Sequence, residues 1–355
     1  MTYRSKLLGA AGLFALSVLG ANPAYAAGTT AGSTITNTVS VAFKVGGLDQ
    51  TGTSASDTLT VDRKINLTVA ENGSTTTVVS PGSLAQVTAF SVTNTSNAVL
   101  DFALAVSQQT GGAGAHSNTD TIDVSNIKMY RDSNGNGILD GTEGSTAITF
   151  LDEIAADATA YVIVVADVPL GQANGSVAAV TLTATGREGG TASSLGIALV
   201  QTSGANTASM DTVFADLAGA TDSARDAAFS AKDDYTISAA TLSAVKSSKI
   251  ISDPFNLTVN PKMIPGANVE YCIQVANGVG GATATSPAIT DVLPTQTTYD
   301  ATFGIKLNGT VTAGVCNADG TTGGTYTAGT TTVSGTLNNL AGGATSTLYF
   351  RVTIN

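Results

Sequence analysis

Apolar and polar residues alternate in short runs along much of this chain, a pattern that predicts β-strands with one face in a core. Two runs near the C-terminus show it most clearly. In 269–275 one face carries Val269, Tyr271, Ile273 and Val275, and the other carries Glu270, Cys272 and Gln274. In 348–354 one face carries Leu348, Phe350, Val352 and Ile354, and the other carries Tyr349, Arg351 and Thr353. Both runs therefore predict half-buried strands of a sandwich.

A similar run, 34–45, lies in an N-terminal segment (27–63) that is too short to build a core of its own. Its side chains Val39, Val41 and Phe43 fall on one face and need a sheet to cover them. We expect the same chain to provide that sheet, because pairing within one chain loses no association entropy. Exchange of this strand with a second copy is the alternative.

Three markers recur in the same order, which predicts a duplicated module. They are Asn-Leu-Thr-Val (66–69 and 256–259), Pro-Gly (81–82 and 265–266), and an Asn that follows a strand-like run (Asn94 and Asn277). The offset between the copies is 190 residues at the first marker, then 184 and 183. The order of elements is thus kept while loop lengths differ, as in duplicated sandwiches.

The repeat divides the chain into five expected parts. They are a signal peptide (1–26), an N-terminal strand segment (27–63), an Ig-like sandwich (64–188), a connection (189–249) and a second Ig-like sandwich (250–355). Within the connection, 211–232 is Ala-rich with scattered charges, and we expect a short helix or an ordered loop there.

The composition supports this division. Only 12% of the residues are charged, aromatic residues are 5%, Trp is absent, and Thr, Ser, Gly, Ala and Val dominate. Chains of this kind build thin sandwiches from many short strands. We therefore predict an all-β protein of tandem Ig-like β-sandwich modules.

The first 26 residues have the parts of a secretory signal. Arg4 and Lys6 give a positive start, 7–21 is apolar, and Ala24-Tyr25-Ala26 predicts cleavage after Ala26. The apolar run is too short and too rich in Gly and Ala for a membrane span, so we expect no transmembrane segment in the mature chain. The predicted location is extracellular or at the cell surface, with the periplasm as the alternative.

The formal net charge is −11, and it becomes −13 when Arg4 and Lys6 leave with the signal peptide. Such a chain repels the phosphates of nucleic acids, so we expect no nucleic-acid partner. An acidic, charge-poor chain suits a protein that binds divalent cations.

One loop has the ligand order of an EF-hand-type calcium site. Oxygen-bearing side chains stand at loop positions 1, 3, 5, 9 and 12, position 6 is Gly137, and position 7 can offer a carbonyl. The predicted ligands are Asp132, Asn134, Asn136, the Ile138 carbonyl, Asp140 and Glu143. Calcium takes six to eight hard oxygens, so this one segment predicts bound Ca²⁺. An Asn/Gly-rich turn without an ion is the alternative.

The chain has two cysteines, Cys272 and Cys316. In an oxidising compartment, an isolated pair is expected to form one disulfide. Metal binding by the pair is not expected, because the single His of the chain, His116, is near neither. The alternation places Cys272 on the outer face of its strand, so the disulfide would tie that face to a loop near Cys316.

No catalytic or cofactor-binding residues are predicted. His116 lies in a Gly-rich polar stretch (111–120) without a nucleophile motif, so we expect a solvated loop residue. The carboxylate pairs Asp152-Glu153 and Asp233-Asp234 are adjacent in sequence. On a strand, adjacent side chains point to opposite faces and cannot flank one bond.

The second copy also resembles a known family. Asp253-Pro254, the Pro-Gly segment 260–266, the strand 269–277 and the Asp-x-Leu-Pro segment 289–294 together resemble the Domain of Unknown Function 11 family. These are Ig-like repeats of prokaryotic secreted and surface proteins. The resemblance covers about 250–355, and it implies an Ig-like sandwich in an extracytoplasmic structural protein without catalytic residues.

The predicted function is that of a secreted, non-enzymatic cell-surface structural or adhesive protein, stabilised by calcium and one disulfide. The expected partners are calcium, and other copies of the chain or cell-surface proteins. A subunit of an extracellular filament or surface layer, assembled by β-strand exchange, is the first alternative. A secreted hydrolase accessory module is the second, and the absence of Trp disfavours it because sugar-binding surfaces use exposed aromatic residues.

Overall fold

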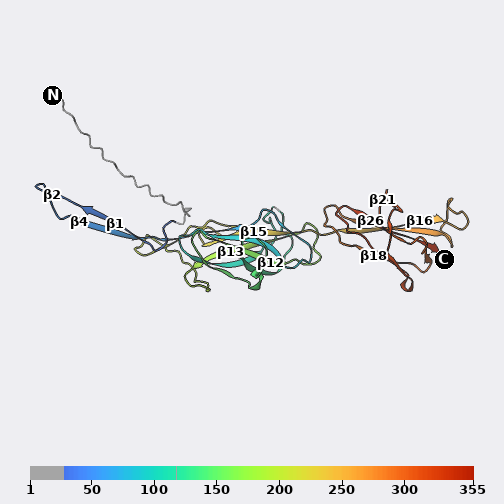
Figure 1. Ribbon diagram of the computed structural model, residues 1–355, viewed down its shortest axis with the longest axis horizontal. Coiled ribbons are helices and arrows are strands. Elements are labelled where there is room, and N and C mark those ends of the chain that lie inside the picture. The colour runs from blue at the N-terminus through green and yellow to red at the C-terminus, as the bar shows by residue number, and fades with distance from the viewer. Residues whose placement is uncertain (1–27, 117) are drawn as a thin grey trace, which may run out of the picture.

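The computed structural model describes residues 28–116 and 118–355, which form β-strands, loops and two short 3₁₀ helices, η1 (Glu143–Ser145) and η2 (Ala328–Thr330). Figure 1 shows an N-terminal hairpin, a central sandwich and a C-terminal sandwich in a row. The predicted all-β class with tandem sandwiches is confirmed. The predicted signal peptide (1–26) lies outside the described residues. Among the residues described, no helix is long and apolar enough to cross a membrane.

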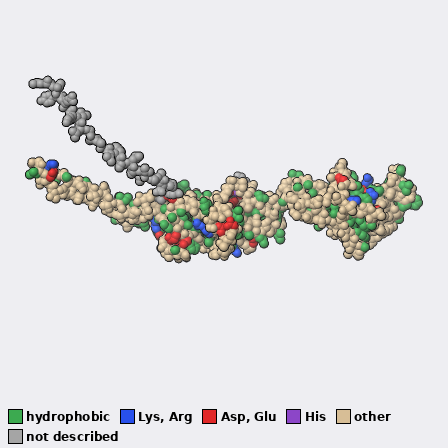
Figure 2. All heavy atoms as spheres, viewed as in Figure 1, with side chains coloured by type: hydrophobic (Ala, Val, Ile, Leu, Met, Phe, Trp, Pro, Cys, Tyr) green, Lys and Arg blue, Asp and Glu red, His purple; other side chains and the backbone are tan. Residues whose placement is uncertain are grey.

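The N-terminal hairpin pairs β1 (Thr34–Val41) with β4 (Thr53–Thr60) in antiparallel register. Its tip is formed by β2 (Lys44–Val45) and β3 (Leu48–Asp49). Figure 2 shows that this arm extends beyond the central sandwich and carries charged side chains only at its tip in this view. A buried Asn97 holds the base of the arm, because its Nδ2 donates to two carbonyls there.

The expectation that the same chain covers the apolar face of 34–45 is wrong for the described residues. Val39, Val41 and Phe43 are 58%, 50% and 49% exposed. The reason is that, within 28–116 and 118–355, β1 and β4 pair only with each other, and no sheet lies over either face.

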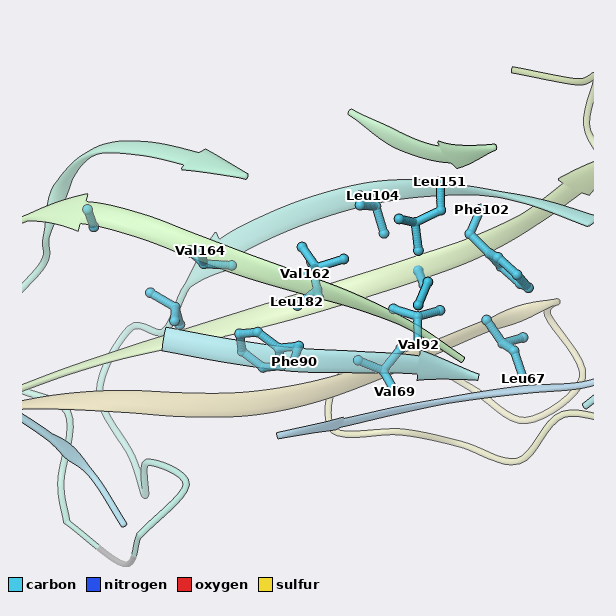
Figure 3. Close-up of a cluster of buried hydrophobic side chains, with 14 of the residues drawn as sticks. Leu67, Val69, Phe90, Val92, Phe102, Leu104, Leu151, Val162, Val164 and Leu182 are labelled. Atoms are coloured by element: carbon cyan, nitrogen blue, oxygen red, sulfur yellow. The ribbon is translucent and has the colours of Figure 1, made fainter. Parts of the chain in front are cut away.

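The central sandwich packs a four-stranded sheet on a five-stranded sheet. The first has the order β10 (Ser125–Asp132), β12 (Thr159–Asp167), β8 (Gln86–Asn94), β6 (Leu67–Glu71). The second has the order β11 (Phe150–Ile154), β9 (Leu100–Gln108), β13 (Val177–Glu188), β15 (Ala228–Ile237), β7 (Thr77–Val79). Figure 3 shows Phe90 and Val162 of the first sheet meeting Phe102 and Leu182 of the second in the core.

The C-terminal sandwich has a larger and a smaller sheet. The larger has the order β16 (Leu242–Ser252), β17 (Asn268–Asn277), β26 (Thr345–Ile354), β20 (Ile305–Gly309), β23 (Thr321–Thr322), and β19 (Thr297–Tyr299) also pairs with β26. The smaller has the order β18 (Ala288–Val292), β25 (Thr332–Thr336), β24 (Thr325–Thr327). The two alternating runs form β17 and β26, which are neighbours in this sheet, and their apolar faces line the core as predicted.

The connection expected at 189–249 is instead built into both sandwiches. β14 (Thr212–Phe214) pairs in parallel with β5 (Arg63–Ile65), β15 lies inside the second sheet of the central sandwich, and β16 opens the C-terminal sandwich. Of the two expectations for 211–232, the helix is wrong and the ordered loop holds for 215–227, which connects β14 to β15.

Only residues 238–241 separate the last strand of the central sandwich from the first strand of the C-terminal one. Asn174 bridges this short linker. Its Oδ1 accepts from the backbone N–H of Ala239 at 2.9 Å, and its Nδ2 donates to the Gly280 carbonyl at 3.3 Å. One side chain thus joins the two sandwiches.

The two sandwiches share a strand order that supports the predicted duplication. β6, β8 and β12 are arranged as β16, β17 and β26 are, and β9 pairs with β11 as β18 pairs with β25. The third marker, the Asn at the end of a long strand, occupies the same place in both copies. The Nδ2 of Asn94 donates to the Ile154 carbonyl at 2.8 Å, and that of Asn277 donates to the Leu340 carbonyl at 2.9 Å.

The first marker, Asn-Leu-Thr-Val, does not occupy equivalent positions in the two copies. Leu67 stands opposite Asn94, and Leu242, not Leu257, stands opposite Asn277. The second Asn-Leu-Thr-Val (256–259) forms an exposed loop after β16, because Asp253 accepts hydrogen bonds from the backbone and side chain of Asn256. The recurrence of these four residues is therefore not part of the duplication.

Candidate functional site

The predicted calcium loop lies between β10 and β11 and folds over the outer face of the four-stranded sheet, where Leu139 packs against a cluster that includes Ala89 and Tyr130. β10 ends at Asp132, whose side chain is almost fully buried. Gly135 and Gly137 both have φ of +72°, a conformation that glycine adopts at little cost. These two glycines let the chain turn back sharply, so that alternate side chains point into the loop.

The side chains at positions 3, 5 and 9 meet inside this loop, and the side chain at position 1 bonds to its backbone. Asp132 accepts from the backbone N–H of Gly135 at 2.6 Å and of Gly137 at 2.9 Å. Asn134 and Asn136 each donate an amide hydrogen to Oδ2 of Asp140, at 3.3 and 2.8 Å. One carboxylate and two amides are thus gathered at one point of the loop.

The position-12 residue closes the loop. Glu143, in η1, accepts from the backbone N–H of Ser133 at 2.7 Å and from its hydroxyl at 2.6 Å. These bonds hold the pKa of the Glu143 carboxyl below its usual value, so it is ionised at neutral pH. The backbone N–H of Ile138 donates to Asn136 at 2.9 Å, which fixes the peptide next to the predicted carbonyl ligand.

The loop has the donor types that a hard divalent cation takes. Three carboxylates and two amide groups come from twelve consecutive residues, and calcium prefers oxygen ligands of both kinds. All six predicted ligands belong to this one loop. However, Asp132, Asp140 and Glu143 are not among the groups of described side chains whose ligand atoms lie within 4.8 Å of one another. Calcium binding by this loop therefore stays a prediction.

The structure joins Cys272 and Cys316 by a disulfide with a Cα–Cα distance of 5.8 Å. Cys272 lies on the outer face of β17, as the alternation predicted, and Cys316 ends the small strand β22 (Val315–Cys316). β22 pairs with β21 (Val311–Thr312). Phe303 and Tyr349 pack around the sulfur atoms. The disulfide therefore fixes an excursion of the chain onto the outside of the larger sheet.

The expectation that His116 is solvated is wrong. Its Nδ1 lies 3.1 Å from Oδ1 of Asp234, and its Nε2 lies 3.2 Å from Oε1 of Glu71. Its backbone N–H also donates to Asp234 at 3.0 Å. His116 thus bridges β6 and β15. No signal in the sequence could reveal this, because the partners stand 45 and 118 residues away.

Burial makes this cluster unusual electrostatically. It raises the pKa of Asp233 to about 7. Partial burial lowers the pKa of His116, but the hydrogen bond to Asp234 and the charge of Glu71 outweigh it, and the net shift is upward. Oxygens of Glu71 and Asp233 and a nitrogen of His116 lie within 4.8 Å of one another. Both ring nitrogens already contact carboxylates, so the arrangement is that of a structural bridge.

The carboxylate pair Asp152-Glu153 also departs from expectation. Asp152 and Glu153 come within 4.8 Å of Asp101, although adjacent strand residues should point to opposite faces. The reason is a bulge, because Glu153 has φ of +50° and the pairing with β9 shifts register there. These carboxylates accept backbone N–H groups of the loop 190–196 and fasten it to the sheet.

Comparisons with known proteins are limited to distant structures. No protein-family model matches the chain, and no curated protein matches it either. The AgI/II polypeptide BspA C-terminal domain of Streptococcus agalactiae is similar over 81% of this chain and 91% of that chain, with 8% identity and a TM-score of 0.34.

Two further structures are similar at the same low level. BspA_C_WT has the same coverage and identity, with a TM-score of 0.36. The CupB6 tip adhesin from Pseudomonas aeruginosa is similar over 82% of this chain and 86% of that chain, with 12% identity and a TM-score of 0.22. At these identities and scores, the likeness supports no statement about what this chain binds.

Proposed function

We propose that this chain is an extracytoplasmic, non-enzymatic structural or adhesive protein of the cell surface. The observation that carries the proposal is the arrangement of a hairpin and two sandwiches in a row, with a four-residue linker bridged by Asn174 (Figure 1). Such an arrangement spans distance with few residues, which is what a stalk or fibre subunit requires. The sequence resemblance to surface repeats supports the same function.

In this proposal calcium and the disulfide are stabilising elements. Ca²⁺ would be held by Asp132, Asn134, Asn136, the Ile138 carbonyl, Asp140 and Glu143, and would supply positive charge among three carboxylates. Extracellular calcium fills sites with dissociation constants as weak as about 10⁻⁴–10⁻³ M, so high affinity is not required. Neither element takes part in chemistry.

A direct test of location uses antibodies raised against residues 27–355. Antibodies should label intact cells that express the gene, and brief protease treatment of those cells should remove the signal. A strain without the gene is the control. Labelling that appears only after the cells are permeabilised would contradict a surface role.

A second candidate function is that of a filament subunit assembled by β-strand exchange. The specific observation in its favour is the uncovered hairpin, whose apolar face packs against nothing in the described chain. An uncovered pair of strands near one end of a subunit can complete a sheet of a neighbour.

A further inference from the structure

The hairpin has the two faces of a sheet that is normally covered on one side. Residues directly opposite each other share a face, and the pairs Ile35–Leu59 and Val39–Ala55 give one apolar face. Thr and Ser fill most of the other face, as in the pair Thr36–Thr58. An antiparallel sheet with such a division usually packs its apolar face on a core.

The C-terminal sandwich has a place for such a pair of strands. In the central sandwich, β9 pairs with β13 and β13 pairs with β15, so two extra strands extend the second sheet, and β15 lies over β6. In the C-terminal sandwich, β18 takes the place of β9, and among the described residues no strand follows it on that side.

The exposure of β16 shows the effect of lacking counterparts to β13 and β15. β6 is covered by β15, and its residues alternate between buried and exposed. β16 occupies the same position in the duplicate, yet every residue from Leu242 to Lys249 is exposed. This difference in exposure is explained by β15, which covers β6 and has no counterpart over β16 among the described residues. The pairing itself does not differ, because β6 pairs with β8 in the same register as β16 pairs with β17.

A groove of about 470 Å³ lies between β16 and β18. Its floor includes Ala244 of β16 and the core residues Ile273 and Val275 of β17, and Ile289 of β18 lines it as well. In the part of the chain that the structure describes, both bordering strands have a free edge, because β16 pairs only with β17 and β18 pairs only with β25. The groove therefore offers an apolar floor and unpaired backbone groups together.

Both surfaces carry few charges. Asp57, opposite Asn37, is the single charged residue of β1 and β4, and it shares the face of Val39. The groove carries Lys246 and Asp291, which pair with each other at 2.6 Å, and Lys249 lies on the opposite face of β16, across from Glu270. The charges of the groove are thus paired, and its apolar floor is the surface that a hairpin would cover.

We propose that the hairpin β1–β4 of one copy docks into the groove between β16 and β18 of a second copy. This inference rests on the structural role proposed above and names its partner. The two hairpin strands supply the extension that β13 and β15 give the central sandwich, and Val39 and Val41 cover the groove floor. Within one copy, the hairpin and the C-terminal sandwich lie on opposite sides of the central sandwich (Figure 1), and the groove belongs to the C-terminal sandwich. Contact between unlike surfaces does not close on itself in a straight row, so copies add head to tail.

The test uses residues 27–355 in calcium-containing buffer and two variants. Val39→Lys/Val41→Lys places charge on the docking face, and Ala244→Trp fills the groove floor. All three positions are exposed, so the variants are expected to fold. Matched controls are Thr38→Lys/Ser40→Lys on the opposite hairpin face and Val245→Trp on the outer face of β16.

Light scattering over a range of concentrations should show growing oligomers for the native chain and both controls, and monomers for each variant alone. A mixture of the two variants should give dimers that grow no further, because one intact hairpin meets one intact groove. Monomers in that mixture, oligomers of either variant alone, or a native chain that stays monomeric would each overturn the inference. Such a result leaves the surface role untouched, because antibody labelling of intact cells tests that role separately.

Discussion

Single carboxylates organise the loops of this protein. Asp253 shows the pattern, because it accepts the backbone N–H groups of Phe255, Asn256 and Lys262. These bonds, that from Asn256 foremost, lower the pKa of Asp253 to about 2. Asp132 likewise accepts the backbone N–H groups of two glycines in the predicted calcium loop. The acidic composition thus has a structural reason, since short carboxylates satisfy N–H groups that loops leave unpaired.

Calcium binding by the loop that ends at Glu143 should stabilise the folded state. At 100 times its dissociation constant, a bound ion stabilises the folded state by about 2.7 kcal/mol. Differential scanning calorimetry of the purified chain should therefore show a transition several degrees lower in chelator than in calcium. Glu143→Gln should remove that difference, and Glu153→Gln, outside the loop, should keep it. Equal melting temperatures of the native chain in chelator and in calcium would contradict calcium binding.

The Asp233 cluster predicts a dependence of stability on pH. The folded state raises the pKa of Asp233 to about 7, so it binds this proton more tightly than the unfolded chain does. The raised pKa of His116 acts in the same direction. Their contributions are therefore greatest at low pH, and are lost as the pH rises from about 4 to just above 7.

Asp233→Asn isolates this effect. The variant should melt a few degrees above the native chain at pH 8 and show no gain at pH 5, as measured by thermal unfolding. Asp123→Asn, at an exposed position, is the control and should change neither value. A gain of equal size at both pH values would exclude ionisation of Asp233 as the cause.

At the scale of elements, strands with a regular apolar alternation could be predicted from the sequence, and strands without it could not. β17 and β26 were predictable because apolar residues alternate over their whole length. β16 was not, because Thr- and Ser-rich strands without a covered face carry no alternation. The pair Asp152-Glu153 misled because one residue with positive φ reverses the facing of its neighbours.

The same limit applies to the candidate sites. The calcium loop could be proposed from the sequence because all its oxygens lie within twelve residues, and calcium binding there stays a prediction. The His116 bridge was not, since it joins three segments that only the sandwich topology brings together.

Asn94 and Asn277 provide a matched pair of element-scale predictions. Each buried amide links the end of a long strand to a carbonyl distant in the sequence, so its loss leaves buried carbonyl groups unpaired. Each Asn→Ala change should cost about 1–3 kcal/mol. In calorimetry, Asn94→Ala should lower the transition of the central sandwich alone, and Asn277→Ala that of the C-terminal one. A shift of both transitions by either variant would contradict independent modules.

Both cysteines of the disulfide lie in the C-terminal sandwich, so the bond should stabilise that sandwich alone. It links residues 44 positions apart, for which chain entropy gives roughly 4 kcal/mol. Cys272→Ser/Cys316→Ser should therefore lower the transition of the C-terminal sandwich and leave that of the central one. Non-reducing peptide mapping of exported native protein should find the two cysteines joined, and two free thiols there would refute the bond.

At the scale of the whole molecule, three parts in a row give the chain two different ends. One end carries the uncovered hairpin, and the C-terminal sandwich at the other carries the groove (Figure 1). The linker between the sandwiches is four residues long and is bridged by Asn174, so their separation is set by hydrogen bonds as well as by chain length. An extended subunit with unlike ends suits a structural role at a surface.

Small-angle X-ray scattering of dilute residues 27–355 in calcium tests this claim most directly. The account predicts an elongated particle, whose pair-distance distribution has an early maximum and a long tail. A symmetric distribution, as from sandwiches folded back against each other, would contradict the extended structural unit on which the proposed function rests.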